Sequence, residues 1–189
     1  MTTIISSLNH LKLPNPETRR QIYPAAFCVG SFFKLFPQYR LYGAMTAHSV
    51  YIIAQIDMVK STSNPNKLKT ASHLVTIASS IVMIYAQIYS HPTLFIASCL
   101  IESAALLYTY NFDKAITAIC VSHASALLLN SWKFSLVGTV IASAIDIGSL
   151  STHVTSNAQK VINVSAIITS CLFCYQASQE DPLELWKFY

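Results

Sequence analysis

Apolar residues run through this chain in long stretches that charged and turn-forming residues interrupt at regular intervals. Each stretch is about twice as long as a typical strand, and none alternates strictly between apolar and polar positions. The pattern therefore predicts α-helices rather than β-strands. The expected helical segments, seven in number, are 22–36, 41–59, 70–90, 92–110, 113–130, 132–150 and 158–177.

The segments between these helices are short and contain residues that favour turns. Pro92 follows His91 directly and suits the first position of a helix, while Asn111 and Asp113 favour a turn and a helix cap. The longest connection, 60–68, is rich in Ser, Asn, Pro and Lys. Short connections predict antiparallel helical hairpins.

The composition predicts that these helices belong to a membrane protein. Hydrophobic residues make up 53% of the chain and charged residues 11%, whereas soluble domains carry about 25% charged residues. The prediction is an all-α polytopic transmembrane bundle of about seven spans, six to eight at the limits, with membrane lipid as its partner. It divides the chain into a polar N-terminal segment (1–21), the bundle (22–178) and an interfacial tail (179–189).

Basic residues are few and unevenly placed. Lys and Arg total 12 against 8 Asp and Glu, with no basic block of the kind that binds nucleic acid, so nucleic acid is not expected as a partner. In a seven-span topology the N-terminal side carries Lys12, Arg19, Arg20, Lys60, Lys67, Lys69, Lys114 and Lys160, and the other side Lys34, Arg40, Lys133 and Lys187. This bias predicts a cytoplasmic N-terminus, a cytoplasmic loop at 60–68 and a tail on the opposite side.

Four ionisable residues fall inside the predicted spans: Glu102, Asp146, His123 and His48. A carboxylate within a membrane span usually faces the bundle interior and marks a site or a pathway. Antiparallel hairpins can bring the four groups together, and Glu102 and Asp146 would then supply acid and base while a histidine orients water or substrate. The structural alternative is that each group only hydrogen-bonds a neighbouring helix.

The acidic residues also recur at a regular interval. Asp57, Glu102 and Asp146 are separated by 45 and 44 residues, which indicates a repeated helical hairpin of similar length. Asp57 is close to a predicted helix end and can reach the interface. Equal spacing also follows from hairpins of equal length, so both explanations stay open.

The remaining histidines and the cysteines give weaker signals. His73, His91 and His153 lie nearer the predicted helix ends, where a solvated or interfacial role is expected. Cys171 and Cys174 form a C-x-x-C without a second pair or a nearby histidine. We therefore expect the cysteines to pack as small apolar residues, and we expect no metal site and no cofactor.

Two short motifs carry a resemblance to a known family. Gly43, Ala47, His48 and Tyr51 lie in one segment, and Gly138 precedes Asp146 by eight residues late in the chain. These motifs resemble those of the lysoplasmalogenase-like polytopic membrane proteins, in which Cys28 would stand near the place of an expected carboxylate. A second register instead places Glu102 and His123 on the family's motifs. The resemblance implies hydrolysis of the vinyl-ether bond of a single-chain lipid, with His48 and Tyr51 binding that lysolipid substrate.

Three functions therefore remain open. A hydrolase predicts one inner cavity around Glu102, Asp146 and His123. A small proton-coupled carrier predicts polar groups along a path through the bundle. A non-catalytic scaffold predicts scattered polar groups, each satisfied by a neighbouring helix.

Overall fold

Helices form all the regular secondary structure in the part of the chain that the structure describes. The structure is a computed structural model, and it describes residues 15–61, 66–107, 112–131 and 133–152 together with short pieces between 164 and 179. The helices are α2 (Pro16–Phe33), the 3₁₀ helix η1 (Pro37–Tyr39), α3 (Arg40–Ser61), α4 (Lys67–Ile88), α5 (Pro92–Leu106), α6 (Phe112–Leu128) and α7 (Lys133–Thr152). These ranges contain no strand, so the predicted all-α class is confirmed.

The predicted helix positions agree closely with α3 to α7. Their ends differ from the predicted ends by at most a few residues. The last predicted segment, 158–177, lies mostly outside the described residues, as do residues 1–14 and the tail beyond Gln179. The described pieces of 158–177 are helical, in agreement with the predicted helix, whereas the predictions for residues 1–14 and for the tail stay predictions.

The start of α2 differs from the prediction. The helix begins at Pro16 rather than near residue 22, because the Asn15 side chain accepts a hydrogen bond from the Thr18 backbone nitrogen at 2.8 Å. Asn before Pro is a strong helix start, since the side chain caps a free N–H and Pro fits the first helical position. Charged residues follow this cap, and the hydropathy pattern alone therefore missed the first turns.

Two hairpins close with the same turn. Ser90 after α4 and Asn130 after α6 adopt left-handed backbone conformations, with φ of 57° and 47°. The backbone nitrogen of His91 donates to the Ala86 carbonyl, and that of Ser131 donates to the Ala126 carbonyl, both at 2.9 Å. This is the Schellman arrangement, which satisfies the last carbonyls of a helix and reverses the chain.

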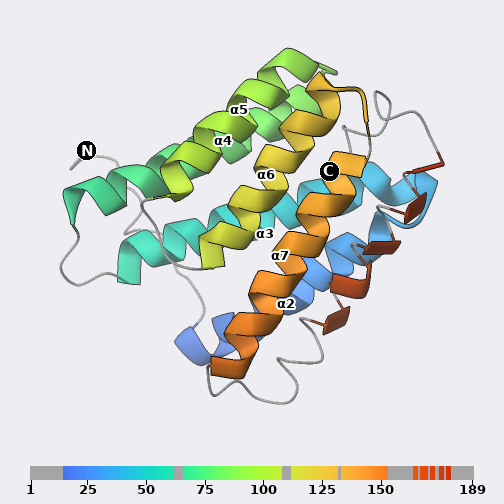
Figure 1. Cartoon of the computed structure of the whole chain (residues 1–189). Helices are drawn as coiled ribbons and strands as arrows, with labels where there is room; N and C mark the ends of the chain where they lie inside the picture. The colour runs from blue at the N-terminus through green and yellow to red at the C-terminus, as the bar shows by residue number, and fades with distance from the viewer. Residues whose placement is uncertain are drawn as a thin grey trace.

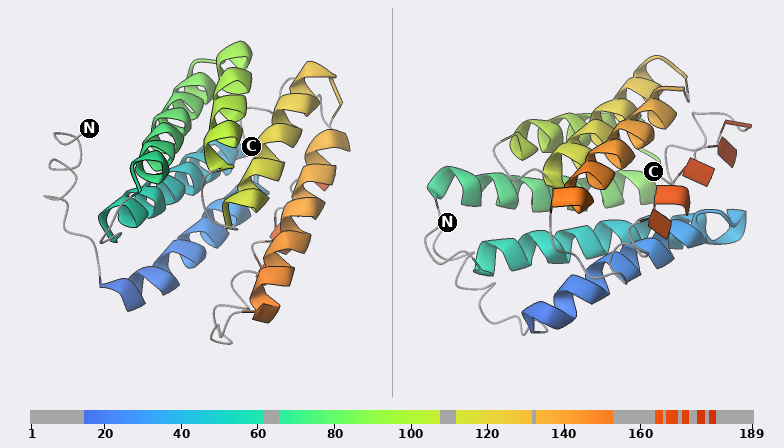
Figure 2. Two further views of the ribbon diagram at one scale, coloured as in Figure 1. Left: turned by 60° about the vertical axis from the view of Figure 1, so that its left-hand side comes forward. Right: turned by 60° about the horizontal axis from the view of Figure 1, so that its bottom comes forward.

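Each described helix packs mainly against its neighbours in the sequence. The closely packed pairs are α2 with α3, α3 with α4, α4 with α5, α5 with α6 and α6 with α7. Figure 1 shows α4 beside α5 and α6 beside α7, and Figure 2 shows the same pairs from two further directions. The antiparallel hairpins predicted from the short connections are confirmed.

Glycine allows close approach at two of these helix contacts. A Cβ atom on Gly43 of α3 would lie 2.5 Å from the Gly30 carbonyl oxygen of α2, so the two backbones touch at this crossing. A Cβ atom on Gly138 of α7 would overlap the Ser122 side chain of α6. Small residues at helix crossings let backbones pack directly against each other.

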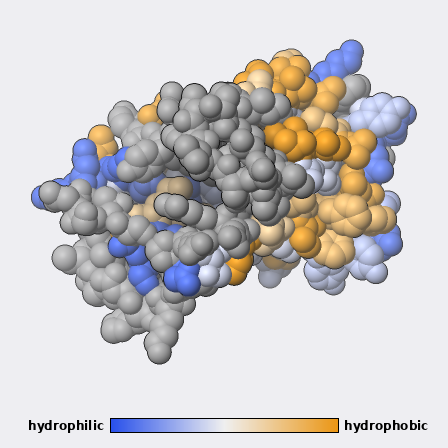
Figure 3. All heavy atoms as spheres, turned by 90° about the horizontal axis from the view of Figure 1, so that it is seen from below, coloured by the Kyte–Doolittle hydropathy of each residue, from blue (hydrophilic) through white to orange (hydrophobic). Residues whose placement is uncertain are grey.

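The described residues include many polar side chains in the interior and many large apolar side chains at the surface, besides a small hydrophobic core. Many buried side chains are small or polar, among them Ser31, Gln55, Thr76, Ser80, Gln87, Ser98, Glu102, Ser135 and Thr139. Many exposed side chains are large and apolar, among them Ile53, Val75, Ile81, Ile88, Leu100, Ile101, Val121, Val137, Val140 and Ile141. Figure 3 shows apolar residues gathered on the right-hand part of this face, with hydrophilic residues on the left and at the far right.

One described helix, α4, is both long enough and apolar enough to cross a membrane on its own. Shorter apolar helices are α5 and the stretches Thr117–Leu128 and Lys133–Ala142 of α6 and α7.

Candidate functional site

The buried face of α4 is polar along most of its length. Seven of its nine buried residues are polar: Thr70, Ser72, His73, Thr76, Ser79, Ser80 and Gln87. Thr70 and Ser72 bond carbonyls one turn earlier in the chain. His73, Thr76, Ser80 and Gln87 follow one another at helical spacing on one face. We call these four residues, with their partners Gln55 and Glu102, the polar track.

Glu102 is the most deeply buried carboxylate in the described part of the chain. It is only 1% exposed, and the Ser80 hydroxyl lies 3.3 Å from each of its two carboxylate oxygens. The hydroxyl can donate its one hydrogen to either oxygen. The prediction that Glu102 faces the interior is therefore confirmed.

The position of Glu102 within its own helix differs from the prediction of a mid-helix site. The helix α5 ends at Leu106, only four residues beyond Glu102. Ser80 nevertheless lies well inside α4, so the pair is in the middle of the hairpin and not at its surface.

His73 and Gln55 form a second buried pair. The distance from His73 Nδ1 to Gln55 Oε1 is 2.6 Å, and both residues are buried. The expectation that His73 has a solvated or interfacial role is wrong. The signal in the sequence was its spacing from Thr76 and Ser80, which places the three residues on one helix face.

A histidine of α3 and a histidine of α6 lie within electrostatic range of each other. His123 is buried and lies within electrostatic range of His48 and of Lys34, which follows the last residue of α2. From the sequence, His48 and His123 were expected to approach the middle of the bundle, but Lys34, near the end of the predicted segment 22–36, was not expected to take part. Tyr51 follows His48 by three residues on α3, so both lie on the same side of that helix.

One face of α6 lies near both Glu102 and the two histidines. Cys120 lies within electrostatic range of Glu102, and His123 follows Cys120 by three residues on α6. Side chains at this spacing share a helix face, with Cβ atoms about 5–6 Å apart. A direct approach of Glu102 to His123 or to Asp146 stays a prediction. Asp146 belongs to α7, but its side chain lies outside the described set.

No group of three His, Cys, Asp or Glu side chains is placed to hold a metal ion in the described part of the chain. Cys171 is a partly buried free thiol. The side chain of Cys174, the other half of the C-x-x-C, is outside the described residues.

Comparison with known proteins returns no relative. No family model, no curated protein and no solved structure matches the chain. The protein can therefore be classified only by its structure, as a helical bundle with exposed apolar side chains and ionisable groups in its interior. The resemblance to lysoplasmalogenase-like proteins stays a hypothesis. Gly43, which helps to carry it, also has a packing role against Gly30.

Proposed function

We propose that the protein is an integral membrane helical bundle. The observation that supports this proposal is the inverted polarity, in which buried positions hold Ser, Thr, Gln and Glu while exposed positions hold Ile, Val and Leu. In water this arrangement would leave large apolar patches exposed, whereas lipid solvates those side chains. The small residues at the helix crossings fit the same environment.

Helix lengths are compatible with a bilayer. The 22 residues of α3 and of α4 extend about 33 Å each, and the hydrocarbon core is about 30 Å thick. The 15 residues of α5 extend only about 22 Å. Because α5 packs between α4 and α6, its ends can be covered by protein rather than by lipid.

Membrane extraction tests this proposal. The expressed full chain is expected to stay in the membrane pellet after alkaline carbonate washing and to enter solution only with detergent. Release by carbonate as a monodisperse protein would refute the proposal.

We propose further that the polar track carries protons or a small cation, as in a small proton-coupled carrier. From His73 to Gln87 the track covers 15 residues of α4, a rise of about 21 Å in a bilayer about 30 Å thick. Buried polar groups extended along the membrane normal fit a path better than one closed cavity. The Thr76 hydroxyl supports this, since it is fully buried and has no hydrogen-bond partner among the described residues.

Glu102 is the carboxylate of this path and, with His73, one of its two groups that can bind and release a proton. Replacing it by Gln keeps its shape and its ability to bond Ser80 but removes the titrating proton. In proteoliposomes with a trapped pH-sensitive dye, Glu102→Gln should reduce proton flux to the level of protein-free vesicles. Asp57→Asn is the matched control, because it makes the same chemical change near the end of α3, and it should keep its flux. Equal flux in the wild type and Glu102→Gln would refute the proposed role.

Hydrolysis of the vinyl-ether bond of a lysolipid is a second candidate, favoured by the burial of Glu102 beside a hydroxyl donor. A carboxylic acid kept neutral by burial can protonate the double bond, after which water adds. Turnover of a lysoplasmalogen in detergent should then fall by about 10²–10⁴-fold in Glu102→Gln, the usual contribution of general acid–base catalysis. Wild-type protein that releases no aldehyde from this substrate would exclude the hydrolase.

A further inference from the structure

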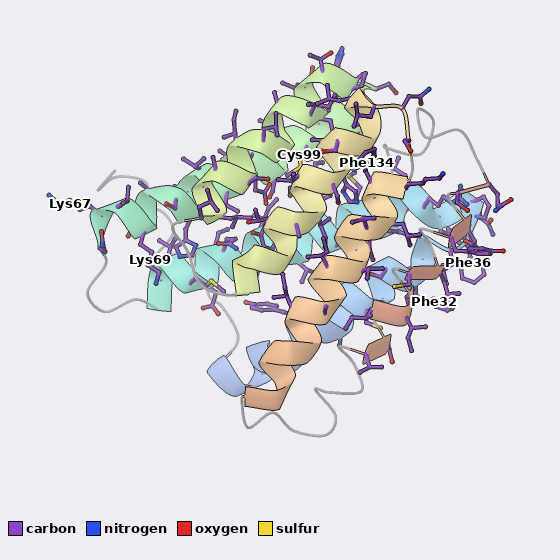
Figure 4. All side chains as sticks on the ribbon, viewed as in Figure 1. Phe32, Phe36, Lys67, Lys69, Cys99 and Phe134 are labelled. Carbon is purple, nitrogen blue, oxygen red and sulfur yellow. The ribbon has the colours of Figure 1, made fainter. Side chains whose placement is uncertain are left out.

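Three sulfur-containing side chains from three helices belong to one buried core cluster. Cys99 of α5 lies with its Sγ 3.5 Å from the Sδ of Met83 on α4, and Cys120 of α6 shares a hydrogen bond with Cys99. All three side chains are buried, with exposed fractions of 2% for Met83, 1% for Cys99 and 6% for Cys120. Figure 4 labels Cys99 where it lies in the bundle, between the upper parts of α5 and α6. We call these three residues the sulfur cluster.

The distance between the Met83 and Cys99 sulfurs is close to that found between two sulfur ligands of one metal ion. With metal–sulfur bonds of about 2.3 Å, three sulfurs around a trigonal ion lie about 4 Å from one another. The Met83–Cys99 separation of 3.5 Å therefore needs to grow by about half an ångström, which side-chain rotation can supply. Thiolate and thioether ligands select soft ions, above all Cu(I).

Charge decides which ion the cluster fits. One thiolate balances the single charge of Cu(I), so a complex with one thiolate, one thiol and one thioether is neutral and suits an apolar interior. Zn²⁺ needs four ligands and more negative charge, and no further His, Cys or Asp completes such a set among the described residues.

We propose that Met83, Cys99 and Cys120 form a binding site for one Cu(I) ion. On binding, one thiol loses its proton to solvent and a Cu–S bond replaces the S–H bond, so one proton is released for each ion and no electron is transferred. The site does not depend on the proposed proton path, because binding can be measured in detergent without transport.

The test uses the purified full chain in detergent, under anaerobic conditions, with Cu(I) supplied as its bicinchoninate complex. The protein should remove one Cu(I) from the chelator and show a thiolate-to-Cu(I) charge-transfer band in the ultraviolet. Cys99→Ser and Cys120→Ser should weaken this binding by on the order of 10–100-fold. Met83→Leu keeps the size of the side chain and removes only the sulfur, so it should fold normally and weaken binding by at least about tenfold.

Other cysteines provide the controls. Cys28 is a partly buried free thiol on α2, and Cys28→Ser should leave Cu(I) binding unchanged. The double variant Cys171→Ser/Cys174→Ser removes the C-x-x-C and should also keep the one-ion stoichiometry. Loss of binding in that double variant, or unchanged affinity in Met83→Leu, would overturn the proposal. So would a wild-type protein that takes no Cu(I) from the chelator.

Discussion

The contact between Gly30 and Gly43 predicts different effects of two similar substitutions. In Gly43→Ala the new Cβ would lie 2.5 Å from the Gly30 carbonyl oxygen and 2.9 Å from the Lys34 backbone nitrogen. Ordinary contacts begin near 3.4 Å, so α2 and α3 must separate by about 0.9 Å. In Gly30→Ala the nearest atom, the Gly43 carbonyl oxygen, would be at 3.0 Å and only about 0.4 Å of movement is needed.

Two opposing contributions set the change in stability of each variant. Alanine is favoured over glycine within a helix by about 1 kcal/mol, and overpacking costs about 1–3 kcal/mol. Because backbone atoms cannot rotate away, we expect the overpacking cost of Gly43→Ala to lie in the upper part of its range. After the gain in helix propensity is subtracted, this variant should be less stable than the wild type by about 1–2 kcal/mol. In Gly30→Ala the two terms nearly cancel, so its stability should stay within about 1 kcal/mol of the wild type.

Thermal unfolding in one detergent, followed by circular dichroism, measures both variants under identical conditions. A loss of 1–2 kcal/mol corresponds to a fall in Tm of about 2–8 °C for a chain of this size. Gly30→Ala serves as the matched control for the general effect of alanine in a helix. A Gly43→Ala protein that melts at or above the wild-type temperature would refute the close helix crossing.

Three further predictions concern other contacts and the topology. Gln55→Leu and His73→Leu should each cost about 1–3 kcal/mol by removing one partner of a buried hydrogen bond, and the double variant should cost less than their sum in unfolding experiments. Gly138→Ala should lower Tm more than Gly30→Ala, because its Cβ would overlap a side chain of α6 and not merely approach a carbonyl oxygen. Cysteines introduced singly into 60–68 and 179–189 should react with an impermeant maleimide from opposite sides of sealed vesicles, and labelling of both from one side would exclude seven spans.

The helices could be predicted because their signals are local. Apolar runs in the sequence predicted α3 to α7. The turn formers around Pro92 and Asn111 predicted where α4 and α5 end and where α5 and α6 begin. The start of α2 could not be found from hydropathy, since its first turns are polar and depend on the cap at Asn15. A search for caps before charged segments would have located it.

The candidate site could be predicted only in part, because its partners are set by tertiary packing. Glu102 stands out in the sequence, since a carboxylate is rare in an apolar run. Gln55 and Ser80 do not stand out, because neutral polar residues are common in such helices and only the packing of α3, α4 and α5 shows which of them meet. Lys34 was missed for a similar reason, as its position beside His123 depends on how α2 lies against the later helices.

The regular spacing of the acidic residues does not make them equivalent, and the reason is the length of α5. Asp57 and Glu102 each lie four residues before the end of their helices, α3 and α5. However, α3 has 22 residues and α5 has 15, so α5 stops about 10 Å short of the length of α3. Asp57 is consequently near the end of the bundle and only partly buried, whereas Glu102 is fully buried at the level of Ser80, deep within α4.

Since α5 runs antiparallel to α4, its last turn lies near the level of Thr76. The final carbonyls of α5, the Thr76 hydroxyl and Glu102 therefore all fall within about two helical turns of one another. The shortness of α5 therefore brings these polar groups together near the middle of α4, around the titratable carboxylate of the proposed proton path.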